Sequence, residues 1–177
     1  MRIITGKFKK AHLFSVPGKT SRPTTDYTKE VIFSILYDCK DKKVLDLYAG
    51  SGSLGLEALS RGASFAVFVD LSNKAITTII RNINKLGCKE NCLIRKKKIS
   101  VYLNNSPEKY DLIFLDPPYK KNLVDKTLEA IYENDLLNPD GKVIVEHSKD
   151  EKLDEKWAFR IEKQKISGAT RISILGA

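Results

Sequence analysis

Two short motifs hold the residues best suited to chemistry. The first is Asp46-Leu-Tyr-Ala-Gly50-Ser-Gly52-Ser-Leu-Gly55, in which Gly50 and Gly52 let the backbone turn sharply and approach a ligand. The spacing of its three glycines also matches a dinucleotide-binding fingerprint. Asp46, just ahead of the glycines, would repel a pyrophosphate but attract the ammonium of a methionine moiety. The motif therefore favours a cofactor with a cationic end.

A second carboxylate stands at a distance that suits the same cofactor. Asp70 ends the next predicted strand, 20 residues after Gly50, where a carboxylate can hold both ribose hydroxyls. We therefore count Asp70 and the following Leu71 as candidate cofactor contacts. This spacing also fits NAD, so an NAD-dependent oxidoreductase is an alternative. The position of Asp46 and the lack of residues suited to hydride transfer argue against it.

The second motif is Asp116-Pro117-Pro118-Tyr119, directly after another predicted strand. Prolines have a fixed φ and no N–H, and Pro117 restricts Asp116 to an extended conformation. The stiff loop presents a carboxylate beside a backbone carbonyl, two acceptors that suit an exocyclic amine. Tyr119 offers a stacking face for a base, worth roughly 1–3 kcal/mol. The motif predicts methyl transfer to an amino nitrogen, with Asp116 stabilising the positive charge that grows during attack.

Alternating strands and helices would position both motifs. Apolar runs and helix-ending glycines predict strands at 43–47, 65–70, 92–95, 110–116 and 141–146, with helices at 26–37, 53–61, 73–86 and 123–132 and a short one after 95. Residues 157–166 and 170–175 predict a terminal β-hairpin that adds one antiparallel strand to the sheet edge. The pattern indicates an α/β fold with a parallel sheet covered on both faces.

Charge is concentrated at the N-terminus. The chain carries 31 basic and 22 acidic residues, a net charge of +9, yet residues 1–25 contain no acidic residue. Two short predicted strands there form a basic β-hairpin extension ahead of a catalytic core at 26–177, together a single domain. Such a surface attracts a polyanion through phosphate contacts. The candidate RNA-binding residues are Lys7, Lys9, Lys10 and Arg22.

Several classes of protein are disfavoured. Three cysteines without a Cys-x-x-Cys pair, and only two histidines, argue against a disulfide framework and a metal site. The apolar runs are too short to cross a bilayer, and the N-terminus lacks the apolar core of a secretion signal. We expect a cytoplasmic protein, acting as a monomer.

The chain resembles the bacterial 16S ribosomal RNA guanine-N2 methyltransferases of the ribosomal small subunit methyltransferase D family. The similarity runs nearly end to end, and its most specific parts are Arg22-Pro-Thr and Gly55 to Gly62. The motifs that carry it are 2–6, 22–26 with 29–36, 46–62, 116–119, 145–147 and 168–171.

The resemblance implies a Rossmann-like class I methyltransferase fold, S-adenosyl-L-methionine as the methyl donor and a guanine of small-subunit RNA as the target. Around the donor it places Asp46, Ala49, Gly50 and Gly52 at the methionine end and Asp70 with Leu71 at the ribose. Asp116 to Tyr119 would meet the reacting base. The segment that would meet adenine falls within 95–99, where no contact is assigned.

Other functions share part of this pattern. An adenine-N6 DNA methyltransferase could use both motifs, although it would usually carry more mass for reading DNA. A protein-glutamine methyltransferase is disfavoured by the positive charge and by Asp rather than Asn at position 116. A non-catalytic RNA-binding or assembly factor would have no need of the intact acceptors at Asp116 to Tyr119.

Overall fold

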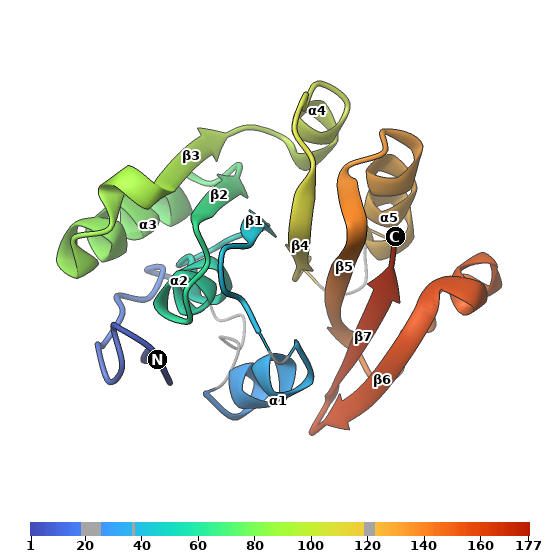
Figure 1. The fold of residues 1–177 in the computed structure, drawn as a ribbon, viewed down its shortest axis with the longest axis horizontal. Helices are drawn as coiled ribbons and strands as arrows, with labels where there is room; N and C mark the ends of the chain where they lie inside the picture. Colours follow the sequence, from blue (N-terminus) through green and yellow to red (C-terminus); the bar gives the residue numbers. More distant parts are fainter. Residues whose placement is uncertain (19–25, 37, 119–122) are drawn as a thin grey trace.

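The fold is built around one seven-stranded sheet. The computed structural model describes residues 1–18, 26–36, 38–118 and 123–177 (Figure 1). The strand order is β3-β2-β1-β4-β5-β7-β6, and the five strands from β3 to β5 are parallel. The sequence-predicted α/β fold with a mainly parallel sheet is confirmed.

The element bounds follow the predicted pattern closely. The parallel strands are β1 (Lys43–Leu47), β2 (Phe65–Asp70), β3 (Cys92–Lys96), β4 (Tyr110–Leu115) and β5 (Leu137–Ser148). The helices are α1 (Asp26–Leu36), α2 (Ser53–Ser60), α3 (Asn73–Leu86), α4 (Ile99–Leu103) and α5 (Leu123–Glu133). Short 3₁₀ turns occupy η1 (Lys89–Asn91) and η2 (Glu155–Arg160).

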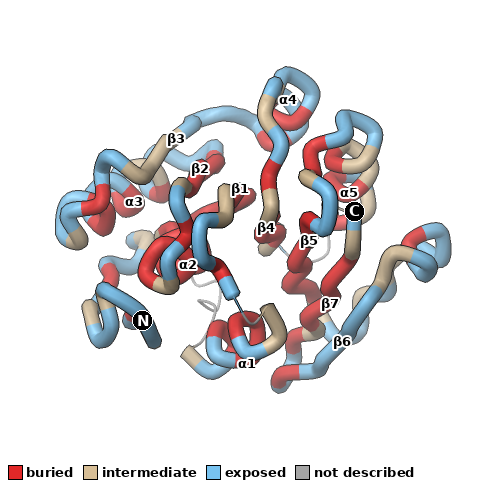
Figure 2. The backbone as a smooth tube through the Cα atoms, viewed as in Figure 1, coloured by how far each residue is buried: buried red, intermediate tan, exposed pale blue. Residues whose placement is uncertain are grey.

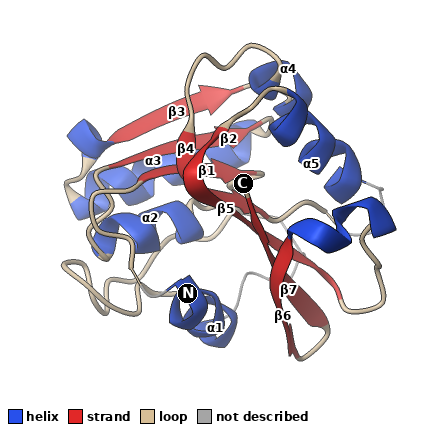
Figure 3. Cartoon of the chain, turned by 45° about the vertical axis from the view of Figure 1, so that its right-hand side comes forward, coloured by secondary structure: helices blue, strands red, loops and turns tan. Residues whose placement is uncertain are grey.

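Helices cover both faces of the sheet (Figure 3). Apolar side chains of α1, α2 and α3 pack against one face, and those of α4, α5 and η2 pack against the other. Successive side chains of a strand point to opposite faces, so Val44 joins the first cluster and Leu45 the second. The central strands are consequently buried along their length, whereas β6 at the edge is mostly exposed (Figure 2).

The C-terminal segment departs from its prediction in two respects. Residues 157–160, predicted as strand, belong to η2, where Asp154 caps the turn by accepting the N–H of Lys156 at 3.0 Å. Both strands of the following hairpin, β6 (Ile161–Ser167) and β7 (Thr170–Gly176), join the sheet, so the antiparallel addition is two strands rather than one. β7 lies between β5 and β6.

The N-terminal arm, residues 1–18, folds back on itself and packs against α2 and α3. In residues 1–18 the two predicted strands are reduced to one antiparallel bridge, Arg2 with His12, and the rest of the arm is turns and irregular chain. Its turn lies so close to α2 that a Cβ added at Gly6 would be 1.7 Å from the backbone oxygen of Ser60, and φ there is +86°. Only glycine fits this contact.

A buried ion pair joins the arm to α1 and α2. Glu57 accepts the N–H groups of Ile4 and Thr5 at 2.8 and 3.1 Å and the Nε–H of Arg61 at 2.8 Å. Lys29 Nζ lies 3.6 Å from the same carboxylate and also donates to the backbone oxygen of Arg2. Both ion-paired side chains are fully buried, so the arm is held by charges shielded from water.

Among the described helices, none is long and apolar enough to cross a membrane.

Candidate functional site

Three aspartates meet at one edge of the sheet. Because β2, β1 and β4 are parallel neighbours, their carboxyl ends lie side by side. Asp46 lies within β1, Asp70 ends β2 and Asp116 follows β4 directly. The connections reverse direction between β1 and β4, and ligands of open α/β sheets bind outside the strand ends at such a switch point.

The glycine loop, residues 48–55, lets α2 pack closely against β1 and β2. Gly55 donates its N–H to Asp46 Oδ2 at 2.9 Å, and a Cβ added at Gly55 would lie 2.5 Å from the ring of Phe68. Gly52 begins the helix with φ +78°. These glycines therefore allow a sharp turn and the close packing of α2 against β1 and β2. The sequence predicted the turn, and the approach to a ligand that it also predicted for Gly50 and Gly52 stays a prediction.

Backbone donors hold the Asp70 side chain in place. Its Oδ2 accepts the N–H of Gly50 at 2.9 Å, and its Oδ1 accepts the N–H of Ser72 at 2.8 Å. Ala49, in turn, donates its N–H to the backbone oxygen of Val69. The loop after β1 and the end of β2 are thus one connected structure, in which the predicted cofactor residues Ala49, Gly50 and Asp70 lie together.

The electrostatics of this edge favour a cation. Asp46 is only 2% exposed, and burial raises its pKa well above the ordinary value of 3.8. The N–H of Gly55 works in the opposite direction, whereas the nearby carboxylates of Asp116 and Asp70 raise the pKa further. A positively charged ligand group placed here would relieve this repulsion and stabilise the ionised form of Asp46.

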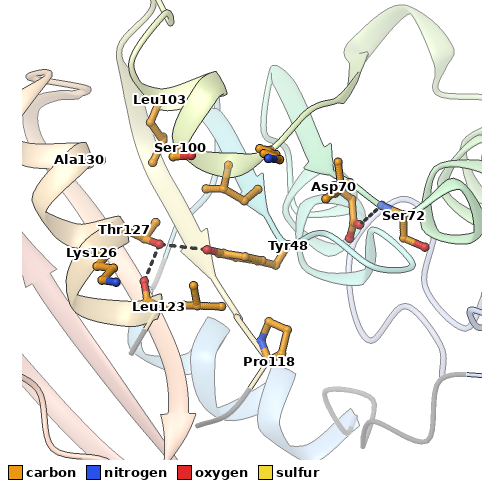
Figure 4. A pocket seen from close by; sticks show the side chains of 13 residues that line it. Tyr48, Asp70, Ser72, Ser100, Leu103, Pro118, Leu123, Lys126, Thr127 and Ala130 are labelled. Atoms are coloured by element: carbon orange, nitrogen blue, oxygen red, sulfur yellow. Dashed lines mark hydrogen bonds between the residues drawn. The ribbon is translucent and has the colours of Figure 1, made fainter. Parts of the chain in front are cut away.

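A cavity of about 580 Å³ opens beside the aspartates, within the 300–1,000 Å³ usual for small-molecule sites. Asp70, Leu71 and Pro118 line it from the strand ends (Figure 4). Its other walls come from α4, the residue before it and α5, through Lys98, Ile99, Ser100, Leu103, Leu123, Lys126, Thr127 and Ala130. The walls are mostly apolar, with Asp70 as the acidic group, which suits a flat ring attached to a hydroxylated sugar.

Tyr48 is a cavity residue that the motif analysis missed. Its backbone is left-handed at φ +57°, and its hydroxyl lies 3.1 Å from Thr127 Oγ1 on α5. The ring extends across the cavity between α5 and the side of Asp70 and Ser72 (Figure 4). Only its place between Asp46 and Gly50 could have suggested this role.

The other missed cavity residues are Ser72 at the N-cap of α3 and a group on or just before α4 and on α5. Ile99 and Ser100 begin α4, and Lys98 precedes them in the basic run where no cofactor contact was assigned. Nothing in the sequence alone shows that α5 folds back beside α4, because the two helices meet only through tertiary packing.

The predicted amine-binding motif, Asp116 to Tyr119, begins beside this cavity. Asp116 is half-buried, Pro117 is buried, and Pro118 is exposed at the cavity wall. Asp116 lies close enough to raise the pKa of Asp46, so the two motifs share one site. Tyr119 lies outside the described residues.

The three predicted RNA-binding lysines of the arm lie away from this edge. Lys7 donates its N–H to the backbone oxygen of Ser60, at the end of α2 opposite the glycine loop. Lys9 and Lys10 follow in the same turn, and all three lysines are exposed. Lys7 also lines a second cavity of about 570 Å³ with Arg61 and Gly62. Arg22 lies outside the described residues.

Comparison with known proteins gives a consistent result. The family model described as "Conserved hypothetical protein 95" matches residues 1–176. The chain is 38% identical to "Putative rRNA methyltransferase YlbH" of Bacillus subtilis, covering 88% of this chain and 86% of that protein. It is 33% identical to "Ribosomal RNA small subunit methyltransferase D" of Haemophilus influenzae, covering 92% and 88% respectively.

A solved structure agrees over nearly the whole length. "Putative methyltransferase yhhF from Escherichia coli" superposes with a TM-score of 0.86 at 29% identity, covering 99% of this chain and 97% of that one. The extent of these matches confirms the resemblance seen in the motifs, and the shared fold is that of the class I methyltransferases. The chain belongs to the family described as Conserved hypothetical protein 95 and is a methyltransferase.

Proposed function

We propose that this enzyme transfers the methyl group of S-adenosyl-L-methionine to the exocyclic N2 of a guanine in 16S ribosomal RNA. The observation that carries the proposal is the placement of Asp116 and Pro118 beside a cavity that Asp70 also lines. An amine acceptor and a nucleoside-sized site thus lie at one edge of the sheet. Relatives named for methylation of small-subunit ribosomal RNA support the choice of substrate.

The residues present fit the cofactor. Asp46, Ala49, Gly50 and Gly52 would hold its methionine end, where buried carboxylates favour a cation. Asp70 would accept ribose hydroxyls, with each of its oxygens already oriented by one backbone N–H. Leu71 and the apolar walls from α4 and α5 would enclose the adenine. When bound, S-adenosyl-L-methionine supplies an electrophilic methyl group on a sulfonium.

The chain's part in the reaction is to position and stabilise the amine. The N2 lone pair of guanine is delocalised into the ring, which makes it a poor nucleophile. Asp116 and the Pro117 carbonyl would accept its two N–H bonds, hold the nitrogen in line and stabilise the positive charge that develops on it. Their attraction grows as the charge grows, so it lowers the barrier more than it strengthens ground-state binding. Tyr119 would stack on the base, which must first leave its helix if it is paired.

The substrate is a polyanion, and the protein is basic. Lys7, Lys9, Lys10 and Arg22 are proposed to contact ribosomal RNA within the small subunit or an assembly intermediate. A net charge of +9 supports such binding through counterion release. The enzyme would act as a monomer in the cytoplasm, where ribosomes are assembled.

The test is methyl transfer from labelled S-adenosyl-L-methionine to small ribosomal subunits that lack the modification, followed by nucleoside analysis. We expect label in N2-methylguanosine with the wild-type enzyme. Asp116→Ala should lower kcat by about 10²–10³-fold while leaving cofactor affinity within a few fold, because the aspartate acts on the amine. Asp150→Ala, which removes an exposed carboxylate outside the site, serves as the matched control.

Other outcomes would contradict the substrate, the activity or the role of Asp116 separately. Label in N6-methyladenine of DNA, or in protein, would replace the substrate while keeping the site. Cofactor binding without transfer to any acceptor would favour a binding or assembly factor. An Asp116→Ala enzyme with wild-type kcat would remove the aspartate from the mechanism.

A further inference from the structure

The outer side of α3 carries three cations without acidic partners. Lys74, Arg81 and Lys85 are exposed, and α3 contains no acidic residue. None of them forms an ion pair with any acidic side chain in the part of the chain that the structure describes. Lys74 lies in the first turn, where the helix dipole disfavours a cation. No acidic side chain therefore neutralises these three charges, and the charge of Lys74 destabilises the helix.

An aromatic ring from the arm organises two of these cations. The guanidinium of Arg81 lies 4.0 Å from the centroid of Phe14, and Lys85 Nζ lies 5.0 Å from it. Phe14 is 37% exposed, so its contacts are made at the surface rather than in the core. Cation–π attraction keeps the two long side chains extended beside the ring. Less rotamer entropy is then lost when they bind an anion.

Hydrogen bonds fix the ring on the helix. Asn82 accepts the N–H of Phe14 at 2.7 Å and donates to its backbone oxygen at 3.1 Å. The same amide also donates to the backbone oxygen of Ser51, within the glycine loop, at 2.9 Å. One buried side chain thus ties the arm, α3 and the cofactor-binding loop together.

The cations form a track that ends at the site. From Lys85 to Lys74 the helix rises about 16 Å at 1.5 Å per residue. Lys74 stands two residues after the N-cap Ser72 and four after Asp70, so this end lies by the cavity. The end of the described arm runs in the same direction, since Lys74 Nζ would lie 3.6 Å from a Cβ added at Gly18.

We propose that Phe14, Lys74, Arg81 and Lys85, here named the α3 basic face, bind the phosphodiester backbone of the RNA substrate and lead it to the site. This inference rests on the proposed function, because it assumes that the substrate is RNA. The α3 basic face differs in position from the turn of the arm that carries Lys7, Lys9 and Lys10. That turn lies at the far end of α2, whereas the α3 basic face adjoins the cofactor edge. The ring acts as a positioning group for Arg81 and Lys85.

The experiment measures binding to deproteinised 16S ribosomal RNA over a series of salt concentrations. The Arg81→Ala/Lys85→Ala double variant should bind about tenfold more weakly near 0.15 M salt. The slope of log affinity against log salt should fall by about 1.4, or about 0.7 for each single-strand phosphate that the variant no longer neutralises. Phe14→Leu should weaken binding several fold with little change in slope, because both charges remain.

Lys163→Ala/Lys165→Ala is the matched control. It removes the same charge from the exposed strand β6, at the opposite edge of the sheet from β3. We expect wild-type affinity and slope. Cofactor affinity and the melting temperature of each variant show that the site and the fold are intact.

The outcomes separate this inference from the function on which it rests. Unchanged affinity and slope in the α3 double variant, with wild-type methylation of small subunits, would overturn the α3 basic face alone. Equal losses in the α3 and β6 double variants would also overturn it, because net charge alone would then explain binding. A wild-type protein that neither binds nor methylates 16S ribosomal RNA would overturn both proposals.

Discussion

The carboxylate of Asp46 accepts the backbone N–H of Gly55 at 2.9 Å, across the interface between β1 and α2. This bond depends on the absence of a side chain at position 55, since a Cβ there would collide with Phe68 at 2.5 Å and lie 3.2 Å from Asp46 Oδ2. The lack of a side chain at Gly55 therefore allows the hydrogen bond to Asp46, rather than the close approach of a ligand. It lets α2 approach closely enough for its backbone to hold the buried carboxylate of Asp46.

Asp46→Asn should separate stability from cofactor binding. Burial raises the pKa of Asp46 in the folded protein above 3.8, its ordinary value, which we take for the unfolded chain. Between these two pKa values, Asp46 is protonated in the folded state and ionised in the unfolded state. Stability therefore falls as pH rises through this window. The asparagine keeps an acceptor for Gly55 and removes this loss. We expect the cofactor-free variant to have a higher Tm than wild type above this window and a similar Tm below it.

The same change should weaken cofactor binding at least tenfold, because a charge that attracts the methionine ammonium is lost. Thermal unfolding of the free protein between pH 4 and pH 8, with calorimetric binding at neutral pH, measures both effects. A variant with the wild-type pH dependence of Tm would show that Asp46 is not the group responsible.

The parallel core could be predicted because its sequence signals are local. Apolar runs such as Val67 to Val69 mark strands buried on both faces, and helix-ending glycines such as Gly87, at φ +64°, mark boundaries. Asp46 and Asp70 lie near the carboxyl ends of β1 and β2, and Asp116 follows β4 directly, so the predicted strands placed all three at one edge. Parallel pairing alone was enough to bring these residues together.

The remainder depends on contacts between distant segments. Trp157 was predicted to lie in a strand from its apolar neighbours, but its indole N–H donates to Asp125 on α5 at 2.9 Å, which favours a turn there. Tyr48 and Thr127, on opposite walls of the cavity, are 79 residues apart. Neither pairing leaves a periodic signal, so sequence patterns could not reveal them.

The buried pair of Lys29 and Glu57 should be strongly coupled. Lys29→Met leaves the buried carboxylate of Glu57 with Arg61 and two backbone N–H groups, and Glu57→Gln leaves the buried ammonium of Lys29 with Asp26 and the backbone oxygen of Arg2. Each change should therefore lower the free energy of unfolding by less than the about 3–5 kcal/mol expected for a fully uncompensated buried charge. Burial already lowers the pKa of Lys29, which shows how poorly the ammonium is solvated. The double variant should lose less than the sum of the two single losses. Urea denaturation of all four proteins measures the coupling, and strictly additive losses would contradict it.

Gly6→Ala should loosen the arm. The new methyl group would meet the backbone of Ser60 at 1.7 Å while adopting a left-handed φ, so the turn must move away from α2. We expect a loss of about 2–4 kcal/mol together with faster proteolysis of the arm. Gly168→Ala is the matched control, because its φ is +64° but nothing lies within 4 Å of the added Cβ. It should cost only about 1–2 kcal/mol, and equal losses would show that the contact with Ser60 contributes nothing.

Leu71→Ala should impair the cofactor site without affecting the fold. Leu71 is 56% exposed although it is large and apolar, and it lines the cavity next to Asp70. Burying such a side chain against a ligand is worth about 1.5–3 kcal/mol, so its loss should weaken cofactor binding about tenfold or more. Ile80→Ala, which shortens an exposed side chain of α3 outside the cavity, should leave binding unchanged. Because Leu71 contributes little to the core, both variants should unfold within about 0.5 kcal/mol of wild type. Wild-type cofactor affinity in Leu71→Ala would place the adenosine elsewhere.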